Sequence, residues 1–255
     1  MRFSFSGDTN VGIKRTRNED NLLKMSEESL FCVADGMGGH SSGEVASQIA
    51  VEGIANFYRA THQDEDITWP YKMDKNRPYD ENRFIMSVKL ANLRIFEASQ
   101  REPRYRGMGT TVAGINFVDD GATVLVAHVG DSRVYRLREG QIGQVTEDHS
   151  LLNDYIKAKK LTQEEIANFP HKNVIVRALG MKESVKVDTF FDQPRSGDVF
   201  LLCSDGLNGM ISDAVIQETL STFPDLDEAV HKLIEKANEA GGMDNVTVVL
   251  ARIDP

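Results

Sequence analysis

Short segments rich in β-branched and aromatic residues recur along this chain, and tight turns join several of them. Segments of this composition and length are typical of strands. Turn signals such as Asp119-Asp120-Gly121 and Glu139-Gly140 fall between neighbouring segments. Because parallel strands need long crossovers and antiparallel strands need only short turns, the sequence predicts antiparallel sheets. The expected strands span residues 30–34, 111–117, 123–129, 133–138, 185–191, 199–203 and 245–253.

Three other segments repeat apolar residues at the spacing of one helix face. The first covers residues 44–58, and Ser41 with Glu44 fits a capping box at its start. Helices on the outside of two packed sheets would bury these apolar faces. The three stripes are formed by Val45, Ile49, Ala50, Ile54 and Phe57; by Phe84, Val88, Ala91 and Ile95; and by Ala229, Leu233, Ile234 and Ala237.

Two stretches depart from this pattern. Residues 59–83 are polar and hold two prolines and the single tryptophan, which predicts a long excursion over the surface. Residues 148–174 interrupt the strands with a short polar helical region at 151–169, which we interpret as a mobile flap. The chain contains no repeat of domain size, so we expect residues 1–255 to form one domain.

The charge balance narrows the classes of partner. Lys and Arg number 29 against 39 Asp and Glu, so the net charge is −10. That sign disfavours a surface for nucleic acid or an anionic membrane, and it suits a site that holds divalent cations. The N-terminal residues lack the apolar stretch of a signal peptide, and no run reaches the roughly 18 apolar residues of a membrane span. Cys32 and Cys203 each lie in an apolar run and are expected to be inert core thiols, which favours a reducing cytoplasm.

Acidic residues recur at the points where apolar runs end or begin. Asp35 ends the run in FCVADG, and Asp205 does the same in FLLCSDG. One such residue alone is typical of a turn and needs no chemistry. In a core of two sheets, strand ends from distant parts of the chain can meet on one face, so we expect these side chains to line one cleft. The set is Glu19, Asp20, Asp35, Asp131, Asp205 and Asp244.

Clustered carboxylates repel one another unless a cation cancels their charge. Carboxylate and carbonyl oxygens suit Mg²⁺ or Mn²⁺, and the scattered histidines without an HExxH or paired CxxC motif disfavour zinc. Gly36 has no side chain, so its carbonyl can approach one ion while Asp35 bridges two. Two ions about 3.5 to 4 Å apart can share a hydroxide and lower its pKa for attack on phosphorus. This pattern indicates a hydrolase.

A phosphate substrate also needs a cation outside the metal pair. Arg15, four residues before Glu19, is a candidate because a guanidinium donates two parallel hydrogen bonds to phosphate oxygens. Taken alone, Lys14, Arg15 and Arg17 are typical of a solvated basic stretch. Their position beside Glu19 and Asp20 favours the functional interpretation.

Eight motifs lie in order between about Gly7 and Ile253: RTRNED, VADGMGGHSSGE, GMGTT, HVGDSRVYRL, TEDHS, RALG, SDGLNGM and GGMDNVTVVL. Together they resemble the metal-dependent Ser/Thr protein phosphatases, the PPM or type 2C family, in their bacterial stand-alone form. One Asp-Gly is a weak signal, whereas eight ordered motifs are specific. The resemblance implies an α+β fold, a four-layer α-β-β-α sandwich of two packed antiparallel sheets flanked by helices, which agrees with the pattern of segments.

The resemblance also implies which residues bind metal and phosphate. It places the family's variable flap at residues 148–174. The implied ligands are Asp35, Asp205 and Asp244 for one Mn²⁺ or Mg²⁺ ion; Glu19, Asp35 and the Gly36 carbonyl for the second; Asp131 with Asp205 for a third, weaker ion; Asp20 through bound waters; and Arg15 for the phosphate.

The sequence departs from the family pattern beside the bridging aspartate. Eukaryotic members usually carry Asp-Gly-His there, and that histidine is proposed to protonate the leaving group, but here the third position is Met37. His40 lies three residues further on, and a structural role suits it at least as well as a catalytic one. The general acid is therefore open, and a metal-bound water is an alternative source of the proton.

The resemblance implies hydrolysis of phosphoserine and phosphothreonine on proteins by direct attack of a hydroxide that bridges two metal ions. Neither cysteine lies in a Cys-x5-Arg loop, so we expect no phosphocysteine intermediate. Three alternatives fit less well. A different two-metal hydrolase, such as a phosphodiesterase or nuclease, would use similar carboxylates, but a nuclease needs a basic track and this chain is acidic. A catalytically dead phosphoprotein-binding member would lack ligands, and here every ligand position is filled. A nucleotide-binding enzyme needs a GxGxxG or GxxxxGK[ST] pattern, which this chain lacks.

The same resemblance implies the partners. We expect phosphorylated proteins and a cognate bacterial Ser/Thr kinase whose signalling the enzyme reverses. We expect no nucleic acid and no membrane insertion. The protein is predicted to be a cytoplasmic monomer.

Overall fold

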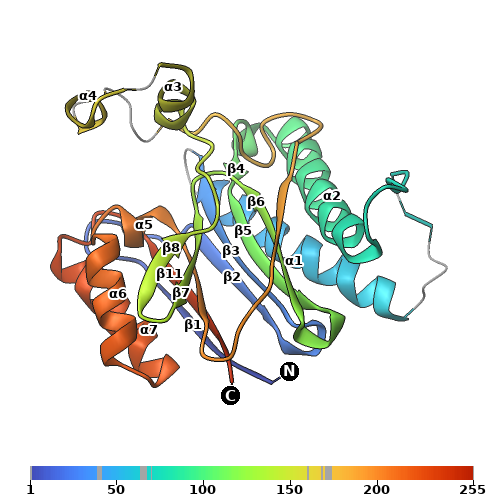
Figure 1. Ribbon diagram of the computed structural model, residues 1–255. Helices are drawn as coiled ribbons and strands as arrows, with labels where there is room; N and C mark the ends of the chain where they lie inside the picture. The colour runs from blue at the N-terminus through green and yellow to red at the C-terminus, as the bar shows by residue number, and fades with distance from the viewer. Residues whose placement is uncertain are drawn as a thin grey trace.

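The computed structural model describes residues 2–38, 42–63, 68–69, 71–159, 161–167, 169 and 174–254. Its strands are β1 Phe3–Asn10, β2 Asp20–Met25, β3 Leu30–Met37, β4 Gly109–Thr110, β5 Val112–Val118, β6 Thr123–Val129, β7 Arg133–Arg138, β8 Gln141–Gln144, β9 Asp188–Asp192, β10 Val199–Cys203 and β11 Val246–Ile253. They form two antiparallel sheets that pack face to face (Figure 1). One sheet has the order β1-β11-β10-β7-β8, and the other has the order β2-β3-β5-β6-β9, with β4 paired to the end of β3.

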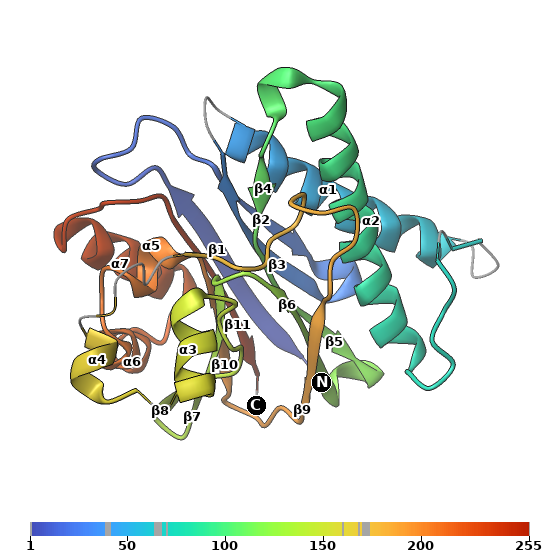
Figure 2. The same cartoon turned by 90° about the horizontal axis from the view of Figure 1, so that it is seen from above.

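Helices cover both outer faces of this pair of sheets (Figures 1 and 2). The α-helices are α1 Ser42–Gln63, α2 Tyr79–Arg101, α3 Leu151–Lys159, α4 Gln163–Ala167, α5 Asp205–Asn208, α6 Asp213–Thr222 and α7 Leu226–Glu239, and short 3₁₀ helices lie at Ser26–Glu28, Pro103–Tyr105 and Asp119–Gly121. Helices α1 and α2 lie on the sheet that contains β3, and α6 and α7 lie on the sheet that contains β10. Helices α3 and α4 stand beyond the strand ends (Figure 1).

Three apolar layers hold the sandwich together. The layer between the sheets contains Phe31, Ile115, Phe200 and Val249, all fully buried. A second layer joins α1 and α2 to one sheet, and a third joins α6 and α7 to the other. Inner strands are therefore covered on both faces, which is why β10 buries all five residues of VFLLC. The predicted four-layer α-β-β-α sandwich is confirmed.

All seven predicted strands are present, and β6, β7 and β10 have the predicted bounds. The sequence prediction missed β1, β2, β4 and β8. Of these, β1, β2 and β8 are edge strands, and β4 has two residues and pairs with β3. Edge strands are paired on one side only and carry more polar residues, so they lack the apolar run that marks an inner strand. β1 alternates Phe with Ser in FSFS, and β8 has only four residues. β9 begins at Asp188 rather than at residue 185, because its ladder with β6 starts there.

The three predicted helices are present and longer than expected. Helices α1 and α2 extend into the segment 59–83 from both sides, so the surface excursion predicted there is shorter and is helical at both ends. Trp69 packs between the rings of Phe57 and Tyr79. The proposed capping residue of α1, Ser41, lies outside the described residues.

The two cysteines are core thiols, as predicted. Cys32 and Cys203 are fully buried and free, and burial raises the pKa of both thiols, which keeps them protonated and unreactive. None of the helices in the described part of the chain combines the length and the apolar content needed to cross a membrane.

Candidate active site

β2 and β3 pair in a register that sets Asp20 opposite Asp35. The sequence predicts a strand that ends at residue 34, but β3 continues through Asp35 because Gly36 and Met37 pair with β4. Thr111 fixes this position: its backbone N–H donates to the Asp35 carbonyl at 2.9 Å, and its Oγ1 accepts from the Asp35 N–H at 3.0 Å. β3 therefore does not end at Asp35. The Asp35 side chain projects from a paired, partly buried stretch of the sheet.

Gly36 has no room for a side chain. A Cβ atom there would lie 2.1 Å from the Gly43 carbonyl oxygen and 2.5 Å from the Glu19 carbonyl oxygen. The Gly36 N–H donates to that Glu19 carbonyl at 3.1 Å. A Cβ atom at Gly43 would in turn lie 2.7 Å from Glu19 Oε2. The two glycines thus let the end of β3, the first turn of α1 and the Glu19 segment pack together.

Asp205 and Asp244 come from the other sheet. Asp205 follows β10 and opens α5, and Asp244 precedes β11, which pairs with β10. Gly206 permits a close approach of these segments, because a Cβ atom there would lie 1.9 Å from the Asn245 carbonyl oxygen. The carboxyl groups of Asp35 and Asp205 lie close enough to interact with each other. Segments of both sheets therefore meet at this point.

Burial and mutual repulsion raise the pKa values of these carboxyl groups. The pKa of Asp35 lies well above its ordinary value, because of burial first and then because of the negative charges of neighbours such as Asp20 and Asp205. Burial is also the first cause of the raised pKa of Asp205, followed by the charge of Asp244. Such a concentration of buried negative charge requires protons or cations to balance it. We call this group the carboxylate cluster; its members are Glu19, Asp20, Asp35, Asp131, Asp205 and Asp244.

Asp20 lies between the two sheets and is buried. Its Oδ2 accepts hydrogen bonds from Ser204 Oγ and Thr247 Oγ1, both at 2.7 Å. Burial raises the pKa of Asp20 to about 7, and the two hydroxyls oppose that rise. Asp20 therefore links β2 to the segments at β10 and β11, a contact that the sequence did not predict. Its action through bound waters stays a prediction.

Asp131 lies in the turn between β6 and β7 and is 8% exposed. Its Oδ1 is buried and has no hydrogen-bond partner in the part of the chain that the structure describes. Burial, followed by the charge of Asp205, raises the pKa of Asp131 to about 7. Because a buried unpartnered carboxylate oxygen is costly, this atom indicates a position that suits a cation.

His149 holds the turn that carries Asp131. Its backbone N–H donates to the Gly130 carbonyl at 2.8 Å, and the Gly130 N–H donates to His149 Nδ1 at 3.0 Å. Burial lowers the pKa of His149, which favours the neutral ring. His149 Nε2 lies 3.0 Å from Asp188 Oδ2 at the start of β9 and 2.9 Å from Arg177 Nη1, which is itself 3.1 Å from the same Asp188 oxygen. The TEDHS motif contains this histidine, but its spacing alone does not show these contacts.

Arg15 lies on the exposed side of the carboxylate cluster. Its Nη2 is 2.7 Å from Asp244 Oδ2, and the side chain of Arg15 is 50% exposed. The hydrogen bond with Asp244 is the first cause of the raised pKa of Arg15. Burial raises the pKa of Glu19, and the nearby Arg15 charge opposes that rise. Lys14 and Arg17 are exposed.

Asn245 was not singled out from the sequence, yet it holds the segment 11–19 against the sheet. Its Oδ1 accepts from the Glu19 N–H at 2.8 Å, and its Nδ2 donates to the Val11 and Arg17 carbonyls at 2.9 and 2.8 Å. The residue is 4% exposed. The only local signal was an amide at the start of an apolar strand, directly after an acidic candidate.

The donor set fits hard divalent cations. The candidate donors are carboxylate oxygens and the Gly36 carbonyl, the ligands that Mg²⁺ and Mn²⁺ prefer. Within the described ranges, no three His, Cys, Asp or Glu side chains converge on one metal position, and Asp244 points to Arg15. Mg²⁺ keeps several waters and needs few protein ligands, so the buried charge and the unpartnered Asp131 oxygen fit an ion of this class.

Comparison with known sequences gives one family. A model of the Protein phosphatase 2C family matches residues 13–251. The chain is 36% identical over 253 residues to the serine/threonine phosphatase stp of Listeria monocytogenes, a match that covers 96% of this chain and 94% of that protein. It is 36% identical over 249 residues to the protein phosphatase PhpP of Streptococcus pneumoniae, with 96% of each chain covered.

Solved structures agree. The serine/threonine phosphatase PstP/Ppp of Mycobacterium tuberculosis matches with a TM-score of 0.85 and 34% identity, covering 99% of both chains. The catalytic domain of PstP in complex with two manganese ions matches with a TM-score of 0.81 and 34% identity, again over 99% of both chains. The sequence matches, the fold and the oxygen donors of the site all agree, and the chain belongs to the protein phosphatase 2C family.

Proposed function

We propose that this metal-dependent phosphatase removes phosphate from phosphoserine and phosphothreonine in proteins. Relatives that match nearly the whole chain are named Ser/Thr or protein phosphatases, which supports this substrate class. The observation that carries the proposal is the carboxylate cluster, in which buried and half-buried acidic side chains from both sheets lie close together. That arrangement is costly without bound cations, and it suits a reaction in which cations take part.

The proposed metal ligands come from both sheets. When bound, two Mn²⁺ or Mg²⁺ ions supply the positive charge that balances the cluster and activate the water that attacks phosphorus. The unpartnered Oδ1 of Asp131 supports a further, weaker position. We assign Asp35, Asp205 and Asp244 to one ion; Glu19, Asp35 and the Gly36 carbonyl to the other; Asp131 with Asp205 to a third; and Asp20 to contacts through water.

Arg15 is proposed to bind the phosphate group of the substrate. Its guanidinium is half exposed and already binds one carboxylate, that of Asp244. A phosphate dianion offers paired oxygens to the same donors and competes with Asp244 for them. Transfer of Arg15 to the phosphate frees Asp244 to turn toward the rest of the cluster.

Met37 occupies the position of the histidine that is proposed to protonate the leaving group in eukaryotic members, so this proton needs another source. Met37 ends β3 and carries no exchangeable proton. His40 lies outside the described residues. We propose that a water molecule of the site donates this proton.

Residues 148–174 are proposed to act as a flap with a fixed base. Arg133 donates to both oxygens of Asp148, with Nη2 at 2.7 Å from Oδ2 and Nε at 2.9 Å from Oδ1. Ser150 and Ile175 pair as an isolated antiparallel bridge. These contacts fasten the two ends of the segment, and α3 and α4 lie between them.

The proposed partners follow from the reaction. Phosphorylated proteins are the substrates, and a Ser/Thr kinase must produce them. We propose that the protein acts as a monomer in the cytoplasm, where its two buried free thiols match a reducing environment.

The experiment that tests the proposed function measures phosphate release from a phosphothreonine peptide. We expect turnover with Mn²⁺, loss of turnover in EDTA, and a fall of about two orders of magnitude or more in Asp35→Asn with Mn²⁺ present. Undiminished turnover in chelator or in the variant would reject the mechanism.

Thermal unfolding without metal provides the control for Asp35→Asn. The substitution removes one member of a repulsive cluster, so we expect the metal-free variant to unfold at the same temperature as the wild type or higher. A lower unfolding temperature would assign the loss of activity to misfolding instead.

A further inference from the structure

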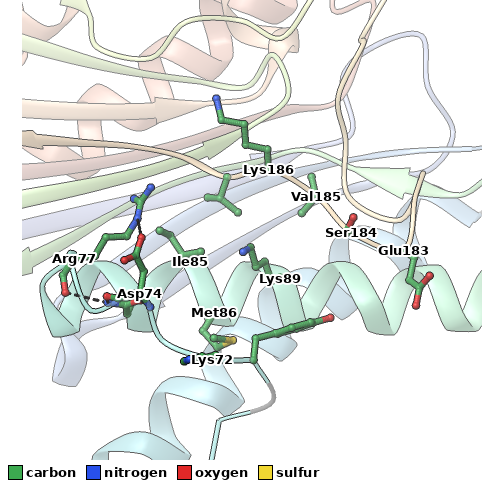
Figure 3. A pocket seen from close by; sticks show the side chains of 13 residues that line it. Lys72, Asp74, Arg77, Ile85, Met86, Lys89, Glu183, Ser184, Val185 and Lys186 are labelled. Carbon is green, nitrogen blue, oxygen red and sulfur yellow. Dashed lines mark hydrogen bonds and ion pairs between the residues drawn. The ribbon is translucent and has the colours of Figure 1, made fainter.

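A pocket of 610 Å³ lies on α2 and shares no lining residue with the carboxylate cluster (Figure 3). Ile85, Met86 and Lys89 line it from α2. One wall is the chain before α2, residues 71–77, and the other is the segment 183–187. The pocket therefore lies between two chain segments that are far apart in sequence.

Two buried asparagines of α2 tie both walls to the helix. Asn82 Nδ2 donates to the Asp74 carbonyl at 2.9 Å, and its Oδ1 accepts from the Asp74 N–H at 2.9 Å. Asn92 Nδ2 donates to the Lys182 and Glu183 carbonyls at 3.1 and 2.9 Å. Asn82 and Asn92 are 5% and 1% exposed. Because buried amides keep such bonds, the pocket is a fixed feature of the fold.

The lining of the pocket is basic, although the chain as a whole carries a net charge of −10. Four cationic and two acidic side chains line the pocket. Because Arg77 also pairs with Glu81 and Lys186 pairs with Asp188, the unbalanced positive charge comes from Lys72 and Lys89, and it favours a negatively charged occupant. The cations are Lys72, Arg77, Lys89 and Lys186, and the acids are Asp74 and Glu183.

Two of these cations are available to an occupant. Arg77 Nε is 3.3 Å from Asp74 Oδ2, and the same guanidinium also binds Glu81, so its charge is offset. Lys186 Nζ is 3.1 Å from Asp188 Oδ1 and is offset in the same way. In contrast, Lys72 and Lys89 have no ion-pair partner among the residues that the structure describes. Lys89 follows Ile85 and Met86 on α2 (Figure 3), so an acidic group bound there has apolar surface beside it.

The segment 183–187 leads to the active site. Leu179 pairs with Thr110, and Thr110 pairs with Gly36. Two strand spacings of about 4.8 Å and four residues of chain at about 3.5 Å each place Glu183 at most about 24 Å from Gly36. About seven residues of extended substrate chain span that distance.

We propose that this pocket docks an acidic segment of the phosphoprotein substrate, about five to ten residues away from the phosphorylated side chain. The proposal rests on the proposed phosphatase function. Acidic side chains of the substrate pair with Lys72 and Lys89, and its apolar atoms pack on Ile85 and Met86. Exposed charge pairs contribute modestly to affinity, so the pocket selects among substrates and does not take part in the chemistry.

The test compares phosphothreonine peptides that carry four aspartates, centred eight residues to either side of the phosphothreonine, with peptides that carry asparagines instead. We expect the wild type to hydrolyse one acidic peptide with a kcat/KM about three- to tenfold above its neutral match, through a lower KM. Salt at about 1 M should remove the difference. The double variant Lys72→Glu/Lys89→Glu should lose the preference and hydrolyse the neutral peptide at the wild-type rate.

A matched control reverses the same number of charges elsewhere. Lys232→Glu/Lys236→Glu on α7, which covers the other sheet, should keep the preference. Equal rates on acidic and neutral peptides in the wild type overturn the docking proposal, while their hydrolysis still supports the phosphatase function. A double variant at Lys72 and Lys89 that fails on the neutral peptide also overturns docking. Failure of the wild type on every peptide rejects the proposed function, and docking with it.

Discussion

The proposed role of Arg15 in binding phosphate, in competition with Asp244, predicts the effect of removing its side chain. Arg15→Ala removes the phosphate contact and leaves the carboxylates in place, so we expect KM for a phosphothreonine peptide to rise about 10- to 100-fold with a smaller change in kcat. Steady-state kinetics with Mn²⁺ measures both constants. Arg17→Ala, an exposed neighbour, is the control and should match the wild type. A loss confined to kcat would contradict simple binding of the phosphate in the ground state.

Individual acids could be singled out from the sequence, but their supporting residues could not. Asp35 and Asp205 each follow an apolar run and precede a glycine, a local pattern, and the structure brings their carboxyl groups together. Asn245 and Ser204 show no local pattern, because their partners at Glu19 and Asp20 lie 226 and 184 residues away along the chain. Contacts of that range become visible only when both sheets are assembled.

At the scale of elements, His149 joins the β6–β7 turn to β9 and to the base of the proposed flap. His149→Ala removes the side-chain bonds to Gly130 and Asp188, so we expect a loss of about 2–4 kcal/mol in the free energy of unfolding. We also expect a higher Mn²⁺ concentration for half-maximal activity, because the turn that carries Asp131 loses its clamp. Chemical denaturation and a manganese titration measure the two effects.

Two further variants test whether the hydrogen bond between His149 and Gly130, rather than the loss of a histidine in general, causes these effects. Asn at position 149 can still accept a bond where Nδ1 lies, so His149→Asn should restore part of both losses. His231→Ala, on α7 with a side chain 70% exposed, should change neither. Equal behaviour of His149→Ala and His149→Asn would show that the bond to Gly130 N–H does not hold the turn.

The elements missed from the sequence have a common physical cause. Inner strands such as β10 are covered on both faces, so their apolar runs identify them without knowledge of their partners. Edge strands such as β1 and β2 depend on pairing with one neighbour, which a local pattern does not reveal. β3 shows the same effect: Asp35-Gly36 is a strong turn signal, but pairing with β2 and β4 keeps that stretch extended.

For the molecule as a whole, the fold brings several acidic side chains together where segments of the two sheets meet. The apolar layers determine the packing of the strands, and that packing forces the carboxylates together. When no cation is bound, protonation of the carboxyl groups reduces the electrostatic repulsion between them. Stability of the metal-free protein must therefore depend on pH in a direction opposite to that of ordinary surface carboxylates.

We expect the metal-free protein to become more stable as the pH falls from 8 to 6.5. Asp20 and Asp131 have pKa values of about 7 in the folded chain, against roughly 3.9 in an unfolded one. Over this window the folded state takes up protons that the unfolded state does not, so the stabilisation is gained as the pH falls through about 7 and lost as it rises. Burial lowers the pKa of His128 to about 3 and also lowers that of His149, so both oppose part of this gain from about pH 7.5 downward, where histidines of the unfolded chain begin to take up protons.

Calorimetry in EDTA should show this as a Tm about 3 to 8 °C higher at pH 6.5 than at pH 8. Asp131→Asn removes one of the titrating groups and should flatten the dependence. Saturating Mn²⁺ should abolish or reverse it, because cations then replace the protons and bind more tightly to ionised carboxylates at higher pH. A Tm in chelator that falls between pH 8 and 6.5 would mean that the cluster stays ionised without metal, and that cations are not needed to balance its charge.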